Sequence, residues 1–206
     1  MLLTDKHIYF NIILMGIVLY SPGRGETPAD YCCGLIETVA EQRGDVFRVL
    51  GYDWKNGTID DWAAAAECAC AEYDPTDTQV VGMSLGSMAA VVAVSRMVVQ
   101  PRRLVLLSLS ARFHEDLPNL PADQTDSFTD VQLKAFGRHR FNHIAPRITC
   151  PTLLVVGELE YRQYPTLAVR VEKAQELIPN AQLVVAEGAG HDLRSPGYRD
   201  VLKKVI

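Results

Sequence analysis

Short apolar runs and longer mixed runs alternate along this chain. The apolar runs have the length and the residue types of buried strands, and they cover residues 46–51, 78–81, 103–109, 152–156 and 182–186. The mixed runs have the length and spacing of helices, and they cover residues 27–42, 59–73, 87–99, 164–178 and 195–206. Strands that alternate with helices in this way are typical of a parallel sheet covered on both faces. We therefore predict an α/β fold with a mostly parallel central sheet and helices on both faces.

The opening of the chain carries a further apolar run over residues 8–20. A helix that spans a membrane needs about 20 apolar residues, and Asn11 and Gly16 interrupt this shorter run. The run also lacks the small-x-small cleavage site of a signal peptide, and cleavage would remove the strand that leads into residues 21–25. We predict one or two core strands here, no stable membrane insertion and a cytoplasmic protein, with secretion through this segment as the minor alternative.

Composition and charge fit a single domain over residues 1–206. A chain of 206 residues with 48% hydrophobic residues can bury a substantial core, and no segment suggests a second one. The net charge of −5, without a concentrated basic stripe, argues against nucleic acid and anionic membranes as partners. The five cysteines lack the spacing of a zinc site, and their odd number is typical of reduced thiols that pack in a cytosolic protein. The sequence implies neither a metal nor an organic cofactor.

A glycine-flanked serine lies between one predicted strand and the helix that follows it. Residues 82–86 read Gly-Met-Ser-Leu-Gly, so Ser84 would stand on a tight turn where Gly82 and Gly86 leave room for a strained backbone. A helix that starts after the serine directs its free N–H groups and its dipole toward a reacting carbonyl oxygen. We predict that Ser84 is a nucleophile; the alternative is a serine that only caps the helix.

His191 is the histidine best placed to act as a general base. It ends the glycine-containing segment Gly-Ala-Gly-His of residues 188–191, just beyond the strand predicted at 182–186. From such a loop, an imidazole can reach a serine hydroxyl over the sheet edge while its other nitrogen faces a carboxylate. His139 and His143 lie among arginines, where a solvated basic patch is the simpler interpretation.

The carboxylate partner is predicted to be Glu160. It lies on the turn beyond the apolar strand at 152–156, where open parallel sheets collect their functional groups. Glu158 precedes it by two residues and is expected to cap the turn or to be solvated. Asp192 adjoins the histidine in sequence but would be badly aimed at its ring, and Asp116, beyond the preceding strand, is a further alternative acid.

Together, these motifs resemble those of the α/β-hydrolase superfamily over residues 17–206. The segment at 82–86 is similar to the nucleophile elbow of that family, residues 151–160 to its acid strand and turn, and residues 188–192 to its histidine loop. The chain order of Ser84, Glu160 and His191 matches the family order of nucleophile, acid and histidine. The family usually has aspartate where this chain has glutamate, which is a known variant.

The resemblance also implies where an oxyanion would bind. In the family, a strand ending in His-Gly leads into a loop that donates one backbone N–H, and the residue after the nucleophile donates the other. Here residues 21–25 read Ser-Pro-Gly-Arg-Gly, so Ser-Pro stands in place of His-Gly. The expected donors are Leu85 and either Gly23 or Arg24, because Pro22 has no N–H. On its own, this segment would be interpreted as an ordinary turn.

Residues 112–147 occupy the place where relatives in this superfamily insert a cap. The prolines and polar residues of their first part predict a loop, and residues 128–138 predict one helix. So short a cap excursion cannot cover a large substrate, and we expect a mostly open pocket. Its candidate walls are Phe113, Tyr161 and Tyr164, for each of which core packing is the alternative.

The resemblance implies a serine hydrolase that cleaves a small-molecule carboxylic ester or thioester through an acyl-enzyme. His191 would take the proton of Ser84, and Glu160 would orient the imidazole. One alternative is an acyltransferase with the same triad, in which an alcohol replaces water. Another, of a different class, is a non-catalytic protein of this fold that binds a ligand or a partner.

Overall fold

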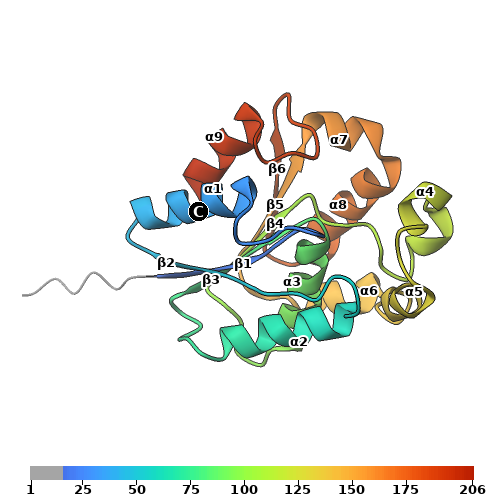
Figure 1. Ribbon diagram of the computed structural model, residues 1–206, viewed down its shortest axis with the longest axis horizontal. Helices are drawn as coiled ribbons and strands as arrows, with labels where there is room; N and C mark the ends of the chain where they lie inside the picture. The colour runs from blue at the N-terminus through green and yellow to red at the C-terminus, as the bar shows by residue number, and fades with distance from the viewer. Residues whose placement is uncertain (1–15) are drawn as a thin grey trace, which may run out of the picture.

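The computed structural model describes residues 16–206 of the protein. Within this range, six parallel strands form one sheet in the order β2-β1-β3-β4-β5-β6 (Figure 1). The strands are β1 (Ile17–Ser21), β2 (Val46–Val49), β3 (Thr78–Met83), β4 (Arg103–Leu107), β5 (Thr152–Gly157) and β6 (Ala181–Ala186). The prediction of a mostly parallel sheet is confirmed. The part of the N-terminal strand prediction that falls on residues 8–15 lies outside the described residues.

Helices cover both faces of this sheet, as predicted. The longer ones are α1 (Tyr31–Gln42), α2 (Ile59–Cys70), α3 (Leu85–Arg96), α8 (Pro165–Leu177) and α9 (Pro196–Val205). Helices α1 and α9 pack on one face, while α2, α3 and α8 pack on the other (Figure 1). Among residues 16–206, no helix has the length and apolar character that crossing a membrane requires.

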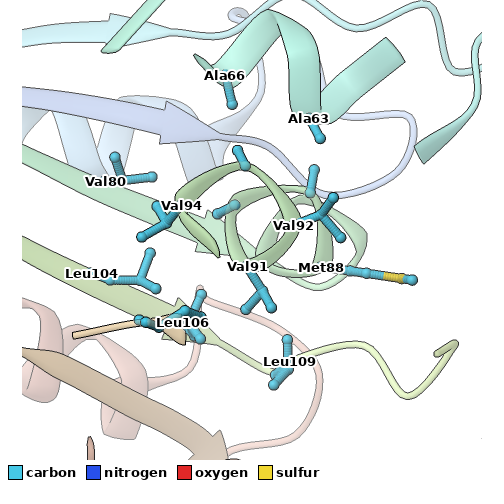
Figure 2. Close-up of a cluster of buried hydrophobic side chains, with 14 of the residues drawn as sticks. Ala63, Ala66, Val80, Met88, Val91, Val92, Val94, Leu104, Leu106 and Leu109 are labelled. Atoms are coloured by element: carbon cyan, nitrogen blue, oxygen red, sulfur yellow. The ribbon is translucent and has the colours of Figure 1, made fainter. Parts of the chain in front are cut away.

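Alternate residues of each central strand enter two different cores. Val80 and Leu104 lie in the core that contains α3 (Figure 2), whereas their neighbours Val81 and Val105 lie in the core that contains α1 and α9. Neighbouring side chains on a strand point to opposite faces. Strands buried on both faces are therefore apolar at every position. This burial explains why the central strands appear in the sequence as continuous apolar runs.

The alanine run of α2 lets that helix approach α3 closely. Ala63 and Ala66 are fully buried on the side of α2 that faces α3 (Figure 2). Helix α3 is buried from Leu85 to Ser95, and only its last residue, Arg96, is exposed. A helix held on all sides is a rigid support. The residue that immediately precedes it, Ser84, is therefore fixed in position.

Two features of the chain differ from the sequence prediction. The segment after β5 forms a short helix, α7 (Glu158–Gln163), where a turn was predicted. Residues 112–147 contain several short helices rather than a loop followed by one helix. These are the 3₁₀ turns η1 (Leu117–Asn119) and η2 (Ala145–Arg147), and the α-helices α4 (Ala122–Thr125), α5 (Asp130–Phe136) and α6 (Phe141–Ile144). Each is fixed by local hydrogen bonds, such as the capping box between Thr129 and Gln132 that begins α5.

All six strands end at the same edge of the sheet because they are parallel. The connections that leave this edge carry the residues singled out from the sequence: Gly23 after β1, Ser84 after β3, Glu160 after β5 and His191 after β6. Strands β3, β4 and β5 are neighbours at the centre. In open sheets of this kind, ligands bind outside the carboxyl ends of the strands.

Candidate active site

Ser84 occupies a strained turn between β3 and α3. Its backbone has φ 51° and ψ −116°, a conformation that few residues other than glycine adopt. A Cβ added to Gly82 would come within 2.6 Å of the Ser87 Cα, and one added to Gly86 would overlap two carbonyl oxygens, those of Ser21 and Pro22. The turn therefore requires glycine at both positions, for the steric reason that the sequence suggested.

This crowding gives a testable difference between two glycines. We expect Gly86→Ala to lower the free energy of unfolding by about 3 kcal/mol, because the backbone of β1 or of α3 must move to admit the methyl group. Gly34 lies within α1, and a methyl group added there would meet no other atom within 4 Å, so Gly34→Ala should raise it by about 0.5–1 kcal/mol. Urea denaturation of both variants checks the pair. Equal effects would contradict the steric argument.

The structure brings His191 against Ser84. The Nε2 atom of His191 lies 3.1 Å from the Oγ of Ser84, within hydrogen-bonding distance. The histidine side chain is 42% exposed, so solvent reaches the ring from the open side of the site. A neutral imidazole with its proton on Nδ1 would accept the hydroxyl hydrogen at Nε2.

Glu160 completes the chain of hydrogen bonds from the other side of the ring. Its Oε2 lies 2.6 Å from the Nδ1 of His191, and the carboxylate is almost completely buried. Its Oε1 accepts the N–H of Gly157 at 2.8 Å and approaches the hydroxyls of Ser108 and Tyr198 at 2.5 and 2.6 Å. Both carboxylate oxygens are thus held in place. Oε2 accepts a hydrogen bond from Nδ1 of His191, which keeps the proton on Nδ1 and leaves Nε2 free to accept from Ser84.

The same contacts decide the ionisation of Glu160. Burial alone would raise the pKa of this carboxyl group. The hydrogen bonds from His191, Ser108, Tyr198 and the Gly157 N–H outweigh burial and hold its pKa below the ordinary value. Glu160 is therefore a carboxylate at neutral pH, whereas burial and the nearby Glu160 raise the pKa of Tyr198, which stays a hydroxyl donor.

Ser108 and Tyr198 are the supporting residues that the sequence prediction missed. Ser108 follows β4 directly, between the strands that lead to Ser84 and Glu160, and its φ of 49° turns the chain there. Its position at the end of a central strand is a signal that could have been used. Tyr198 comes from α9, and no local pattern in the sequence connects that helix with the site.

The alternative acids have other partners. Asp116 is buried and forms two-pronged hydrogen bonds with the guanidinium of Arg170. Glu158 accepts the N–H of Gly188 at 2.9 Å and so caps the histidine loop. Asp192 accepts hydrogen bonds from Arg194. None of the three contacts the imidazole, whereas Glu160 does.

The expected oxyanion donors differ in whether their backbone N–H already forms a hydrogen bond. Leu85 is the first residue of α3, so its N–H has no acceptor within the helix. The N–H of Gly23 is engaged, since it donates to the carboxylate of Glu26 at 2.6 Å, and this carboxylate also accepts the hydroxyl of Tyr20. The Arg24 N–H forms none of the backbone hydrogen bonds found among residues 16–206.

Ser84 and His191 line two adjoining pockets. The first, of about 480 Å³, is bordered by Gly23, Arg24 and Glu26 on the β1 side. The second, of about 290 Å³, extends under the cap segment. We call them the loop-side pocket and the cap-side pocket. The reacting atoms would lie where the two meet, and each pocket can hold one side of a bond that is cleaved there.

Only one of the three aromatic side chains expected to form walls lies against these pockets. Tyr164 lines the cap-side pocket and is 37% exposed. Phe113 is completely buried in the core, with its ring against that of Phe141, so its assignment as a wall is wrong. Tyr161 is half-buried and its hydroxyl hydrogen-bonds to Glu172, away from both pockets. Phe113 thus follows the core-packing alternative, whereas Tyr161 is not a wall and packs only partly on the core, because its hydroxyl is directed to Glu172 on α8.

Residues 16–206 contain no cluster of three or more histidine, cysteine, aspartate or glutamate side chains suited to a metal. In the same range all five cysteines are free thiols. Cys33, Cys70 and Cys150 are buried, and burial raises their pKa values to about 12, 12 and 11.

No protein-family model matches the chain, and no curated protein matches it significantly. Solved structures do match. Est1E from Butyrivibrio proteoclasticus has a TM-score of 0.74 at 14% identity, covering 92% of this chain and 86% of that one. Alpha/beta hydrolase domain-containing protein 10 from mouse has a TM-score of 0.71 at 14% identity, covering 91% and 86%. The protein has the α/β-hydrolase fold. A lipase-esterase related protein from Clostridium acetobutylicum, with a TM-score of 0.67 at 15% identity over 92% and 93% of the two chains, shares it.

The α/β-hydrolase fold accounts for how distant segments of this chain meet. Ser84, Glu160 and His191 follow β3, β5 and β6, and the parallel sheet returns each strand end to the same edge. At 14–15% identity these neighbours establish the fold. The roles of individual residues rest on the local geometry of this chain.

Proposed function

We propose that the protein is a serine hydrolase that cleaves a carboxylic ester or thioester through an acyl-enzyme, with Ser84 as nucleophile, His191 as general base and Glu160 as the orienting acid. The observation that carries this proposal is the unbroken hydrogen-bond chain from the Ser84 hydroxyl to the buried Glu160 carboxylate. A serine placed only to cap a helix needs neither partner. Solved structures of this fold support the proposal too, since one is a lipase-esterase related protein and another is Est1E with bound ferulic acid.

The first half of the reaction follows from the hydrogen bonds. His191 Nε2 takes the hydroxyl proton as the Ser84 Oγ attacks the carbonyl carbon, and the imidazolium that forms is stabilised by Glu160. Collapse of the tetrahedral intermediate breaks the bond to the leaving alcohol, to which His191 returns the proton. The product of this half is an ester between the substrate acyl group and Ser84.

The second half uses water. Because the His191 ring is 42% exposed, a water molecule can approach it from the solvent side. The histidine takes one proton of that water as its oxygen attacks the acyl carbon, and then returns a proton to the Ser84 oxygen. The open approach favours water over a bound alcohol as acceptor, and so favours hydrolysis over acyl transfer.

The developing oxyanion would be held by two backbone N–H groups. We assign Leu85 as one donor, because its N–H lies at the start of α3 next to Ser84. For the second we choose Arg24 over Gly23, since Glu26 already accepts the Gly23 N–H. Each donor of this kind is typically worth about 3 kcal/mol of barrier.

A fluorophosphonate probe tests the proposal directly, because it forms a stable bond only with an activated serine. We expect the folded protein to gain the probe mass at Ser84, located by peptide mass spectrometry, and to hydrolyse 4-nitrophenyl acetate or butyrate. Heat-denatured protein is the control and should remain unlabelled. Absence of labelling in protein shown to be folded by circular dichroism would refute the hydrolase assignment and leave the binding-protein alternative.

A further inference from the structure

In the part of the chain that the structure describes, Arg112 forms no ion pair and no hydrogen bond with a carboxylate. It follows β4 and lines the cap-side pocket together with Ser84 and His191. Its Nη1 donates to the Oγ of Ser110 at 2.9 Å and its Nη2 to the carbonyl oxygen of Gln124 at 3.0 Å, which are both neutral acceptors. Its Nε is buried, and within residues 16–206 it has no acceptor. Burial and then the charge of Arg24 lower the pKa of Arg112, and the smaller effect of the Asp116 charge opposes them.

Arg170 is a buried guanidinium that, unlike Arg112, is paired with a carboxylate. Its Nε and Nη2 donate to both carboxylate oxygens of Asp116, at distances of 2.6 to 3.2 Å. Burying a charge is costly unless a counter-charge accompanies it. The Asp116 carboxylate is used by Arg170, and Arg112 is left without an equivalent. The Arg112 charge therefore lies beside the reacting groups with no carboxylate bonded to it.

A second guanidinium increases the positive charge at this place. Arg24 and Arg112 lie over the ring of Phe128, with their Cζ atoms 4.1 and 5.0 Å from its centroid. Arg24 hydrogen-bonds to the hydroxyl and the carbonyl oxygen of Ser127, and it borders the loop-side pocket. Asp123, an exposed carboxylate that also lines the cap-side pocket, forms no ion pair with either arginine among the described residues. Two like charges held together in this way favour an anion between or beside them.

We propose that the cap-side pocket binds a carboxylate of the substrate through Arg112, so that the preferred esters carry a second, anionic carboxylate close to the bond that is cleaved. That the ligand is an ester rests on the proposed function. Binding of a carboxylate in this pocket does not require turnover. Nη1 and Nη2 of Arg112 each carry a second N–H besides the one used on Ser110 or Gln124, and two N–H groups of a guanidinium can pair with the two oxygens of a carboxylate. A pocket of about 290 Å³ suits a short acid rather than a long acyl chain.

The kinetic test compares two substrates that differ in charge only. 4-Nitrophenyl hydrogen glutarate carries a free carboxylate, and its methyl ester is the neutral counterpart. A second pair, 4-acetoxybenzoate and its methyl ester, places the carboxylate on the leaving group. In the wild type we expect kcat/KM to favour the anionic member of at least one pair by about tenfold or more. In Arg112→Gln this ratio should fall to near one, and Arg112→Lys should retain part of it.

Arg147→Gln is the matched control. It removes the same charge from an exposed residue of η2, which precedes β5 and so lies at the opposite edge of the sheet. Its charge ratio should equal that of the wild type. No preference for the anionic member in either pair, or a preference that persists in both Arg112 variants while their melting temperatures show them folded, would overturn the proposal.

Binding without turnover separates this proposal from the proposed function. Calorimetric titration of Ser84→Ala with glutarate should show binding that Arg112→Gln weakens by about tenfold. If no serine is labelled by the fluorophosphonate but glutarate binds in this Arg112-dependent way, the hydrolase assignment fails and the anion site stands. If esters are cleaved but Arg112→Gln leaves glutarate binding unchanged, the anion site fails and the hydrolase assignment stands. Tighter binding of phenyl phosphate than of glutarate would overturn the choice of a carboxylate.

Discussion

Replacing Ser84 with alanine is expected to lower kcat for 4-nitrophenyl butyrate by about 10⁴-fold or more, because in the proposed mechanism its Oγ forms the covalent intermediate. KM should change little, since the side chain is small and both pockets keep their walls. The fold should persist, because the Ser84 N–H that bonds to the Leu107 carbonyl at 2.8 Å belongs to the backbone and is kept. Stopped-flow and steady-state assays on freshly purified protein measure the loss.

Ser95→Ala is the control for this substitution. Ser95 lies near the far end of the same helix, α3, and its hydroxyl donates only to the Val92 carbonyl oxygen. The variant removes the same atom and should keep wild-type turnover and labelling. Turnover by Ser84→Ala at a rate close to that of the wild type would mean that a different group does the chemistry, and the mechanism proposed above would be wrong.

Glu160→Gln should lower kcat by about 10³- to 10⁴-fold at neutral pH. An amide at this position can donate where the carboxylate only accepts, so it would favour the wrong tautomer of His191 and would stabilise no imidazolium. Glu158→Gln is the matched control, as it makes the same change two residues away on α7, where the side chain holds Gly188 rather than the ring. A large loss confined to the Glu158 variant would refute the assignment of the acid.

The lowered pKa of Glu160 also predicts how the stability of the fold depends on pH. The folded protein holds the pKa of Glu160 below its ordinary value of 4.5, so the unfolded chain binds this proton more readily than the folded one. Glu160 therefore stabilises the fold above that ordinary value, and this contribution is lost as the pH falls through the folded-state pKa. Urea midpoints measured from pH 6 to pH 3 should fall more steeply for wild type than for Glu160→Gln. Parallel curves would contradict this.

Local patterns were sufficient for the features that local physics fixes. The sheet followed from continuous apolar runs, because strands buried on both faces are apolar at every position. Ser84 followed from its two glycines, since the strain of the turn is relieved only by the absence of side chains. His191 and Glu160 were placed near it because parallel strands end at one edge.

The features that the sequence did not reveal depend on contacts between distant segments. Helix α7 begins with a hydrogen bond from the Gly157 N–H to Glu160, and that carboxylate is held in place by Ser108 and Tyr198, which are remote in sequence. Phe113 is turned into the core by its packing against Phe141, which the single apolar letter does not indicate. The Gly23 N–H donates to Glu26, and this bond depends on the conformation of the Glu26 side chain, which the spacing of residues in the sequence does not indicate.

The position of Glu160 in the first turn of α7 links the formation of this helix to the ordering of the site. As the third residue of α7, Glu160 accepts the N–H of Gly157, the residue that caps the helix, with one oxygen and hydrogen-bonds to the imidazole with the other. Helix initiation and assembly of the reactive pair thus share a single carboxyl group. Fraying of the first turn of α7 would consequently separate Glu160 from His191 while the sheet beneath remained intact.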